Sequence, residues 1–191
     1  MFNKLTHAAI SVDTIQRQAA KGLRWFIAAN SAIIIAIALR TPDVASNTLI
    51  TATIAISLFS FLVTQFNNKA LVQNTLAVAL MGQVMLMVAV MKGHTYQVDV
   101  HMYFFACLGI LAIFLSYQVI LFATLAVAVH HLVLNLIVPA YVFPGDAGIL
   151  RVLLHATILL IEAGVLMGLC WLVNLAFNNA DTAQKAAEET F

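Results

Sequence analysis

The sequence predicts an all-α integral membrane protein, a polytopic bundle of six transmembrane helices with both termini in the cytoplasm. Hydrophobic residues make up 63% of the 191-residue chain and charged residues only 9%, whereas a soluble domain is about 25% charged. Apolar runs near 20 residues long recur along the chain, and such a run spans about 30 Å of hydrocarbon at 1.5 Å per residue. Lys and Arg are unevenly shared between the two ends of these runs, which sets the expected orientation.

Polar or helix-breaking residues separate the six apolar runs. The first ends near Pro42, the second at Asn67 and Asn68, the third at Gly93 and the fifth at Pro139, since proline and glycine interrupt helices. The fourth run is short, so a hairpin or a tilted, half-buried helix is an alternative there, and five spans is the alternative count. The runs cover residues 23–39, 48–66, 71–91, 97–115, 119–138 and 149–175.

An even number of spans places both termini on one side of the membrane. Six of the nine Lys and Arg fall on that side and three on the other, so the positive-inside rule puts the termini in the cytoplasm. The terminal side carries Lys4, Arg17, Lys21, Arg24, Lys69 and Lys185, and the opposite side Arg40, Lys92 and Arg151.

The chain divides into three segments by composition. Residues 1–22 are polar and amphipathic, without the features of a signal peptide, and are expected to be cytoplasmic. Residues 23–175 form the six-helix domain. Residues 176–191 are rich in good helix formers and are expected to begin a cytoplasmic helix that continues into a signalling domain downstream of residue 191. A net charge of +1 without a basic block argues against a nucleic-acid partner.

Five of the six histidines lie within residues 92–162, together with the acids Asp99 and Glu162 and an asparagine, in or beside apolar sequence. Ionisable groups are costly in hydrocarbon and are by default candidates for a functional site. A single intramembrane histidine is more often a packing residue than a ligand, but five at matching depth favour a metal or haem site. The group comprises His94, His101, His130, His131, His155, Asp99, Glu162 and Asn135.

Three of these histidines, on three different helices, are expected at one depth. At 1.5 Å per residue, His131 lies about 12 Å below the outer end of its helix and His155 about 6–9 Å below the start of the sixth. His101 lies at the outer end of the fourth helix. Residues four apart share a helix face, so His131 is expected to point into the bundle with Asn135, and His130 to point away from it.

The remaining polar residues have expected supporting roles. Asp99 could orient the His101 ring by accepting a ring N–H, and His94 could close the site from above. Glu162 lies deeper and could accept a proton or support a ligand. Imidazole suits copper, iron and zinc, while two histidines can also hold a b-type haem, so both kinds of cofactor are open.

The segments GHTYQVDVHMYFFACLGILAIF, AVAVHHLVLNLIVPAYVFPG and GILRVLLHATILLIEAGVL carry a family resemblance. The chain resembles the N-terminal transmembrane sensory regions of bacterial, chiefly alphaproteobacterial, methyl-accepting chemotaxis proteins and related signalling proteins. The resemblance implies a multi-pass sensory module of the inner membrane, a homodimer joined to a cytoplasmic signalling helix, and no enzyme activity. The five histidines, the two acids and Asn135 named above occupy the matching positions.

Two other classes of function compete with the sensor. A membrane metal or haem oxidoreductase, or an electron carrier, would use the same ligands and needs a catalytic base, for which Glu162 is the buried candidate. A metal or proton transporter needs a polar path through the bilayer, and the inner halves of the last three spans offer few polar residues. His7, in the cytoplasmic segment, is expected to have no part in the site.

Overall fold

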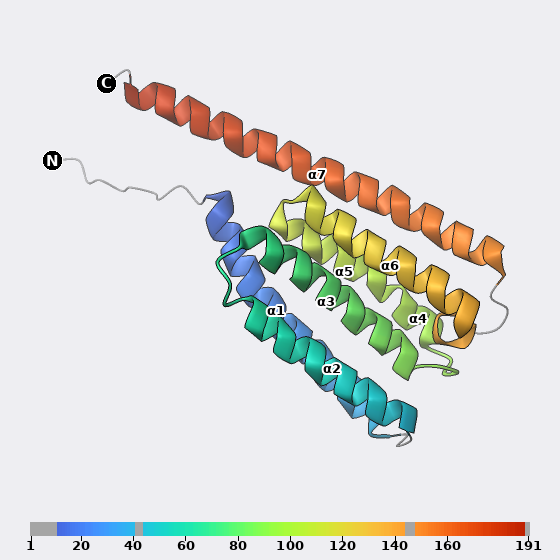
Figure 1. Cartoon of the computed structure of the whole chain (residues 1–191). Helices are drawn as coiled ribbons and strands as arrows, with labels where there is room; N and C mark the ends of the chain where they lie inside the picture. The colour runs from blue at the N-terminus through green and yellow to red at the C-terminus, as the bar shows by residue number, and fades with distance from the viewer. Residues whose placement is uncertain (1–10, 41–43, 144–147, 190–191) are drawn as a thin grey trace.

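Helices joined by short turns make up the described chain in a computed structural model that describes residues 11–40, 44–143 and 148–189 (Figure 1). This confirms the all-α class. His7 and the loop around Pro144 lie outside the described residues. The helices are α1 (Val12–Ala38), α2 (Val44–Val63), α3 (Lys69–Val90), α4 (Gln97–His101), α5 (Tyr103–Leu111), α6 (Tyr117–Ile137) and α7 (Ile149–Glu189), with short 3-10 turns η1 (Ala112–Phe114) and η2 (Pro139–Tyr141).

Six spans are long and apolar enough to cross a membrane among the described residues. The fourth, which the sequence left open, is one span of 18 residues, Gln97–Phe114, made of α4, α5 and η1 in succession. The chain is therefore a multi-pass membrane protein by the length and composition of its helices.

Helix α3 is the centre of the bundle. It contacts α1, α2, α4, α5 and α6, and its inward side chains Leu76, Leu80, Met81 and Val84 are fully buried. Helix α7 lies along α6 at the edge of the bundle and extends past the end of α6 (Figure 1). The start of α1 and the end of α7 lie at the same end of the bundle, called here the terminal end, and the α3–α4 loop and η2 lie at the opposite, histidine end.

A satisfied polar cluster joins α1, α2 and α3 in the apolar interior. The Gln83 amide donates to Ser31 Oγ at 3.0 Å and to the Thr53 carbonyl at 3.1 Å, and it accepts from Thr53 Oγ1 at 2.9 Å. Buried polar groups in hydrocarbon need such partners. Each interhelical bond of this kind is worth about 0.6 kcal/mol on average, so the cluster fixes the register of three spans.

The turn between η1 and α6 is held at the terminal end by two distant side chains. Leu115 has a left-handed backbone (φ 49°), which costs a residue with a Cβ about 1–2 kcal/mol. The Asn174 side chain donates to the Leu115 carbonyl, and Gln16 donates to that of Phe114. Cys170 lies 3.8 Å from the Ala112 carbonyl. Both α1 and α7 are thereby attached to this turn.

Two helices extend beyond their apolar runs. Helix α1 begins at Val12, eleven residues before the apolar run, because Ser11 caps it by accepting from the Thr14 N–H at 3.2 Å. Helix α7 runs unbroken through residue 175 to Glu189, and its residues 178–187 are exposed on all sides.

Candidate histidine site

Three imidazole rings from α4, α6 and α7 meet at the histidine end. The ring centre of His101 lies 5.0 Å from that of His131 and 5.3 Å from that of His155, and the last two are 6.2 Å apart. His101 and His131 are buried, and His155 is half-buried. The structure therefore brings together the three histidines that were expected at one depth.

Backbone hydrogen bonds determine which ring nitrogens carry protons. His131 Nδ1 lies 2.9 Å from the Val127 carbonyl, and His155 Nδ1 lies 2.8 Å from the Arg151 carbonyl. A carbonyl can only accept, so in each neutral ring the proton sits on Nδ1 and Nε2 presents a lone pair. The two rings thus offer acceptors to the site.

The closest contact in the trio joins two ring nitrogens. His131 Nε2 lies 3.1 Å from His101 Nε2. Without a metal, one proton must lie between these atoms, and it belongs to His101 because His131 is protonated at Nδ1. His101 Nδ1 is then a buried acceptor with no hydrogen-bond partner in the described part of the chain.

Phe143 covers the trio from the η2 side, a role that the sequence analysis missed. Its ring centre lies 4.8 Å from His155, 5.6 Å from His101 and 5.8 Å from His131. The N–H groups of Val142 and Phe143 both bond to the Pro139 carbonyl at 2.9 Å, which folds the chain back over the rings. In the sequence, the signal for this role was the presence of an aromatic residue shortly after Pro139, the proline that follows α6.

Gln97 holds this cover in place and was also missed. It is fully buried, accepts from the Gly93 N–H at 3.0 Å and donates to the Ala140 carbonyl at 3.1 Å. One side chain thus joins the α3–α4 loop to η2. Its sequence signal was weak, because a glutamine in a polar loop is normally solvated.

Two cavities meet at the trio. An apolar cavity of about 250 Å³ lies among α5, α6 and α7 and is lined by all three histidines. Its wall includes Leu132 and Leu153, which are about half exposed, so it opens on the lipid-facing surface. A second cavity of about 310 Å³ is lined by His101, His155, Met102, Phe143 and Arg151. His101 and His155 stand between the two.

His130, Asn135 and Glu162 lie near the trio without joining it. The His130 ring packs against Phe104 at 6.1 Å and against His131 at 5.3 Å. His130 Nε2, Asn135 Oδ1 and Glu162 Oε2 are buried and have no partner among the residues that the structure describes. Glu162 lies seven residues along α7 from His155, about 10 Å away along the helix.

His94 and Asp99 lie outside the cluster. His94 is exposed in the α3–α4 loop, where its Nδ1 accepts from the Tyr96 N–H at 3.2 Å and its ring packs on that of Tyr96. Asp99 is exposed, and no hydrogen bond joins it to His101 within the described chain. Residues two apart on a helix point to nearly opposite sides, which is why this carboxylate does not orient the imidazole.

The donor atoms of the trio fit a metal ion in part. Among the described residues, no three His, Cys, Asp or Glu already have their donor atoms gathered round one point. The 3.1 Å between the His101 and His131 Nε2 atoms is nevertheless close to the about 3.3 Å that separates two imidazole ligands of a tetrahedral zinc ion with Zn–N bonds near 2.0–2.1 Å. Two of the three rings thus fit an ion, and the His155 ring must turn its Nε2 toward them.

The chain was also compared with known proteins. No protein-family model, curated protein or solved structure matches it. An inference about the function of this chain therefore depends on its own six-span bundle and on the imidazole trio at the histidine end.

Proposed function

We propose that the chain is the sensory input module of a transmembrane receptor of the chemotaxis type, with a transition metal ion held by His101, His131 and His155. The observation that carries the proposal is the meeting of three imidazoles from three helices, two of which present Nε2 lone pairs. Lone pairs attract a cation and repel an anion. Imidazole nitrogen is a good ligand for copper, iron and zinc.

A directly bound ion fits the trio better than a b-type haem. Bis-histidine ligation places the two imidazoles on opposite faces of the macrocycle. With their Nε2 atoms 3.1 Å apart, His101 and His131 leave no room for a porphyrin between them. The apolar cavity beside them and the cover of Phe143 keep water away from such an ion, which strengthens its bonds to the ligands.

Elemental analysis and an optical spectrum of the purified, never-chelated protein test the metal. We expect about one copper, iron or zinc per chain and no Soret band. A Soret band with stoichiometric iron would show that the cofactor is haem and not a directly bound ion. Folded protein that holds neither would remove the metal from the proposal and turn the trio into a proton or small-ligand site.

Helix α7 is the proposed output. It contributes His155 at the histidine end and continues without a break to Glu189 beyond the bundle. Its buried positions, Val152, Leu159, Ala163 and Cys170, form one narrow stripe, so α7 is packed against the bundle on one face only. In the receptor, the terminal end faces the bacterial cytoplasm, the histidine end faces the periplasm, and two copies form a homodimer.

Spin labels can test whether the metal moves α7. We expect labels on the exposed Asn179 and Asn67 to change their mean separation by about 1–2 Å on metal binding, the usual size of a helix shift in signalling. Both native thiols are buried and should not react. The same distance with and without metal would contradict an output through α7, and His131→Ala serves as the metal-free control.

Glu162 supports a second candidate, a proton-coupled metal carrier or oxidoreductase of the membrane. Its Oε2 is buried without a partner in the described chain, and intramembrane acids of this kind are often proton carriers. Protein in sealed vesicles separates the two proposals, because a carrier moves metal across the bilayer and a receptor does not.

A further inference from the structure

A polar cavity lies at the terminal end of the bundle, opposite the end that carries the histidine site. It has a volume of about 370 Å³ and lies between the start of α1 and the α2–α3 loop. Its side chains include Asp13, Gln16, Arg17, Lys21, Lys69 and Gln73.

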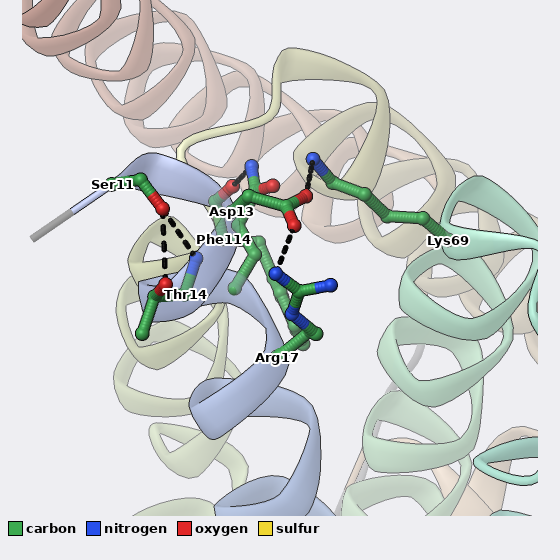
Figure 2. A network of polar contacts seen from close by, with 7 residues as sticks. Ser11, Asp13, Thr14, Arg17, Lys69 and Phe114 are labelled. Atoms are coloured by element: carbon green, nitrogen blue, oxygen red, sulfur yellow. Dashed lines mark hydrogen bonds and ion pairs between the residues drawn. The ribbon is translucent and has the colours of Figure 1, made fainter.

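The charge of this cavity is positive. Among the described residues, three cations and one carboxylate line it, and the carboxylate, Asp13, lies 2.5 Å from Arg17 and 3.0 Å from Lys69 (Figure 2). Subtracting one negative from three positive charges leaves +2. The Arg17, Asp13 and Lys69 side chains are 70%, 45% and 49% exposed, and ion pairs this exposed are weak. Arg17 and Lys69 can therefore turn from Asp13 to another anion at little cost.

The floor of the cavity is polar and buried. Gln16 and Gln73 are 6% and 5% exposed. Gln16 donates its amide N–H to the Phe114 carbonyl, which leaves its Oε1 buried with no partner among the described residues. The cavity thus has cations at its rim and buried polar side chains at its base.

The depth of the cavity matches the lipid headgroups. Helix α1 has 27 residues and is about 40 Å long, roughly 10 Å more than the hydrocarbon layer. Its apolar run starts at residue 23, so Arg17 and Lys21 project from the polar part that reaches beyond the hydrocarbon. Phe66, which is 60% exposed, lines the same cavity and supplies an apolar contact for an acyl chain.

We propose that this cavity binds the headgroup of an anionic phospholipid, with the phosphate among Arg17, Lys21 and Lys69. Basic pockets between transmembrane helices on the cytoplasmic side bind such headgroups. The site lies on the cytoplasmic side in the orientation proposed above, but its chemistry depends on neither the metal nor the sensory role.

Native mass spectrometry of the full chain in mild detergent tests the site with phosphatidylglycerol as the probe and phosphatidylcholine as the neutral comparison. We expect phosphatidylglycerol to be retained preferentially. Lys21→Gln or Lys69→Gln should each weaken its binding about fivefold, as expected for one cation near a lipid phosphate. Asp13→Asn should strengthen binding, because it removes the competing carboxylate. Lys21→Arg should bind as the wild type does.

Lys185→Gln is the matched control. Lys185 is exposed and belongs to the last turns of α7, which lie at the same end of the bundle, but it does not line the cavity, so its loss should leave binding unchanged. If Lys185→Gln weakened binding as much as Lys21→Gln, the attraction would be that of a basic surface, and the proposal would fail. Equal retention of both lipids, weaker binding by Asp13→Asn, or displacement by millimolar inorganic phosphate would also overturn it.

Discussion

Replacing His131 with alanine is expected to abolish metal retention. His131 Nε2 faces His101 Nε2 at 3.1 Å, and its proton is held on Nδ1 by the Val127 carbonyl, so alanine removes the best-oriented lone pair of the site. His155→Ala should have the same effect. The metal affinity should fall by at least about 100-fold, the upper range found even for residues that only support a ligand. Elemental analysis and a competition titration with a chelator measure the loss.

His130→Ala is the matched comparison for His131→Ala. The two residues are neighbours on α6 and equally close to the bilayer centre, but the His130 ring packs against Phe104 and does not meet His101. We expect this variant to weaken retention only modestly, and His7→Ala to have no effect. Equal metal content in the His130, His131 and His155 variants would refute the assignment of His131 as the inward ligand.

Replacing Gln97 with leucine is expected to loosen the site from outside the trio. The change removes the part-buried hydrogen bonds from the Gly93 N–H and to the Ala140 carbonyl, and a typical hydrogen bond contributes about 0.5–1.5 kcal/mol to stability. Because η2 carries the chain to Phe143, the cover over the rings should become mobile. The metal affinity should fall about 10-fold, within the range for supporting residues, and the thermal stability of the metal-free protein should fall as well.

A double-mutant cycle with Phe143→Leu shows whether Gln97 acts through the cover. If it does, the losses in metal affinity of the two single variants should not add, since both remove the same element. Gln118→Leu, an exposed glutamine on α6, controls for the added apolar surface. Additive losses would show that Gln97 stabilises the fold without positioning Phe143.

The positions of the spans could be predicted because the bilayer fixes the length of an apolar helix. The run at residues 119–138 and helix α6, Tyr117–Ile137, differ by two residues at the start and one at the end. The start of α1 could not be predicted in this way, because hydrogen bonding by Ser11 and not apolarity extends that helix. By contrast, the helix formers Ala, Gln and Glu after residue 175 predict a helix from the sequence, and α7 continues to Glu189.

The candidate site was predictable in its depth and not in its surroundings. Helix geometry gives the height and face of His131 and His155 from the sequence alone. The distances between rings, the cover of Phe143 and the two hydrogen bonds of Gln97 depend on how α4, α6 and η2 approach one another. Asp99 shows the opposite error, since its closeness to His101 in the sequence suggested a contact that the helix prevents.

The contact of α7 with the η1–α6 turn lies midway between His155 and the end of the helix at Glu189. Cys170 and Asn174 lie against this turn, and His155 and Glu189 are each 15 residues beyond them, about 22 Å along the helix on either side. If α7 is rigid and pivots at this contact, a tilt moves its two ends by equal distances in opposite directions, because the two arms have the same length. A movement of His155 toward α6 would therefore move the exposed C-terminal end of α7 away from the bundle by the same distance.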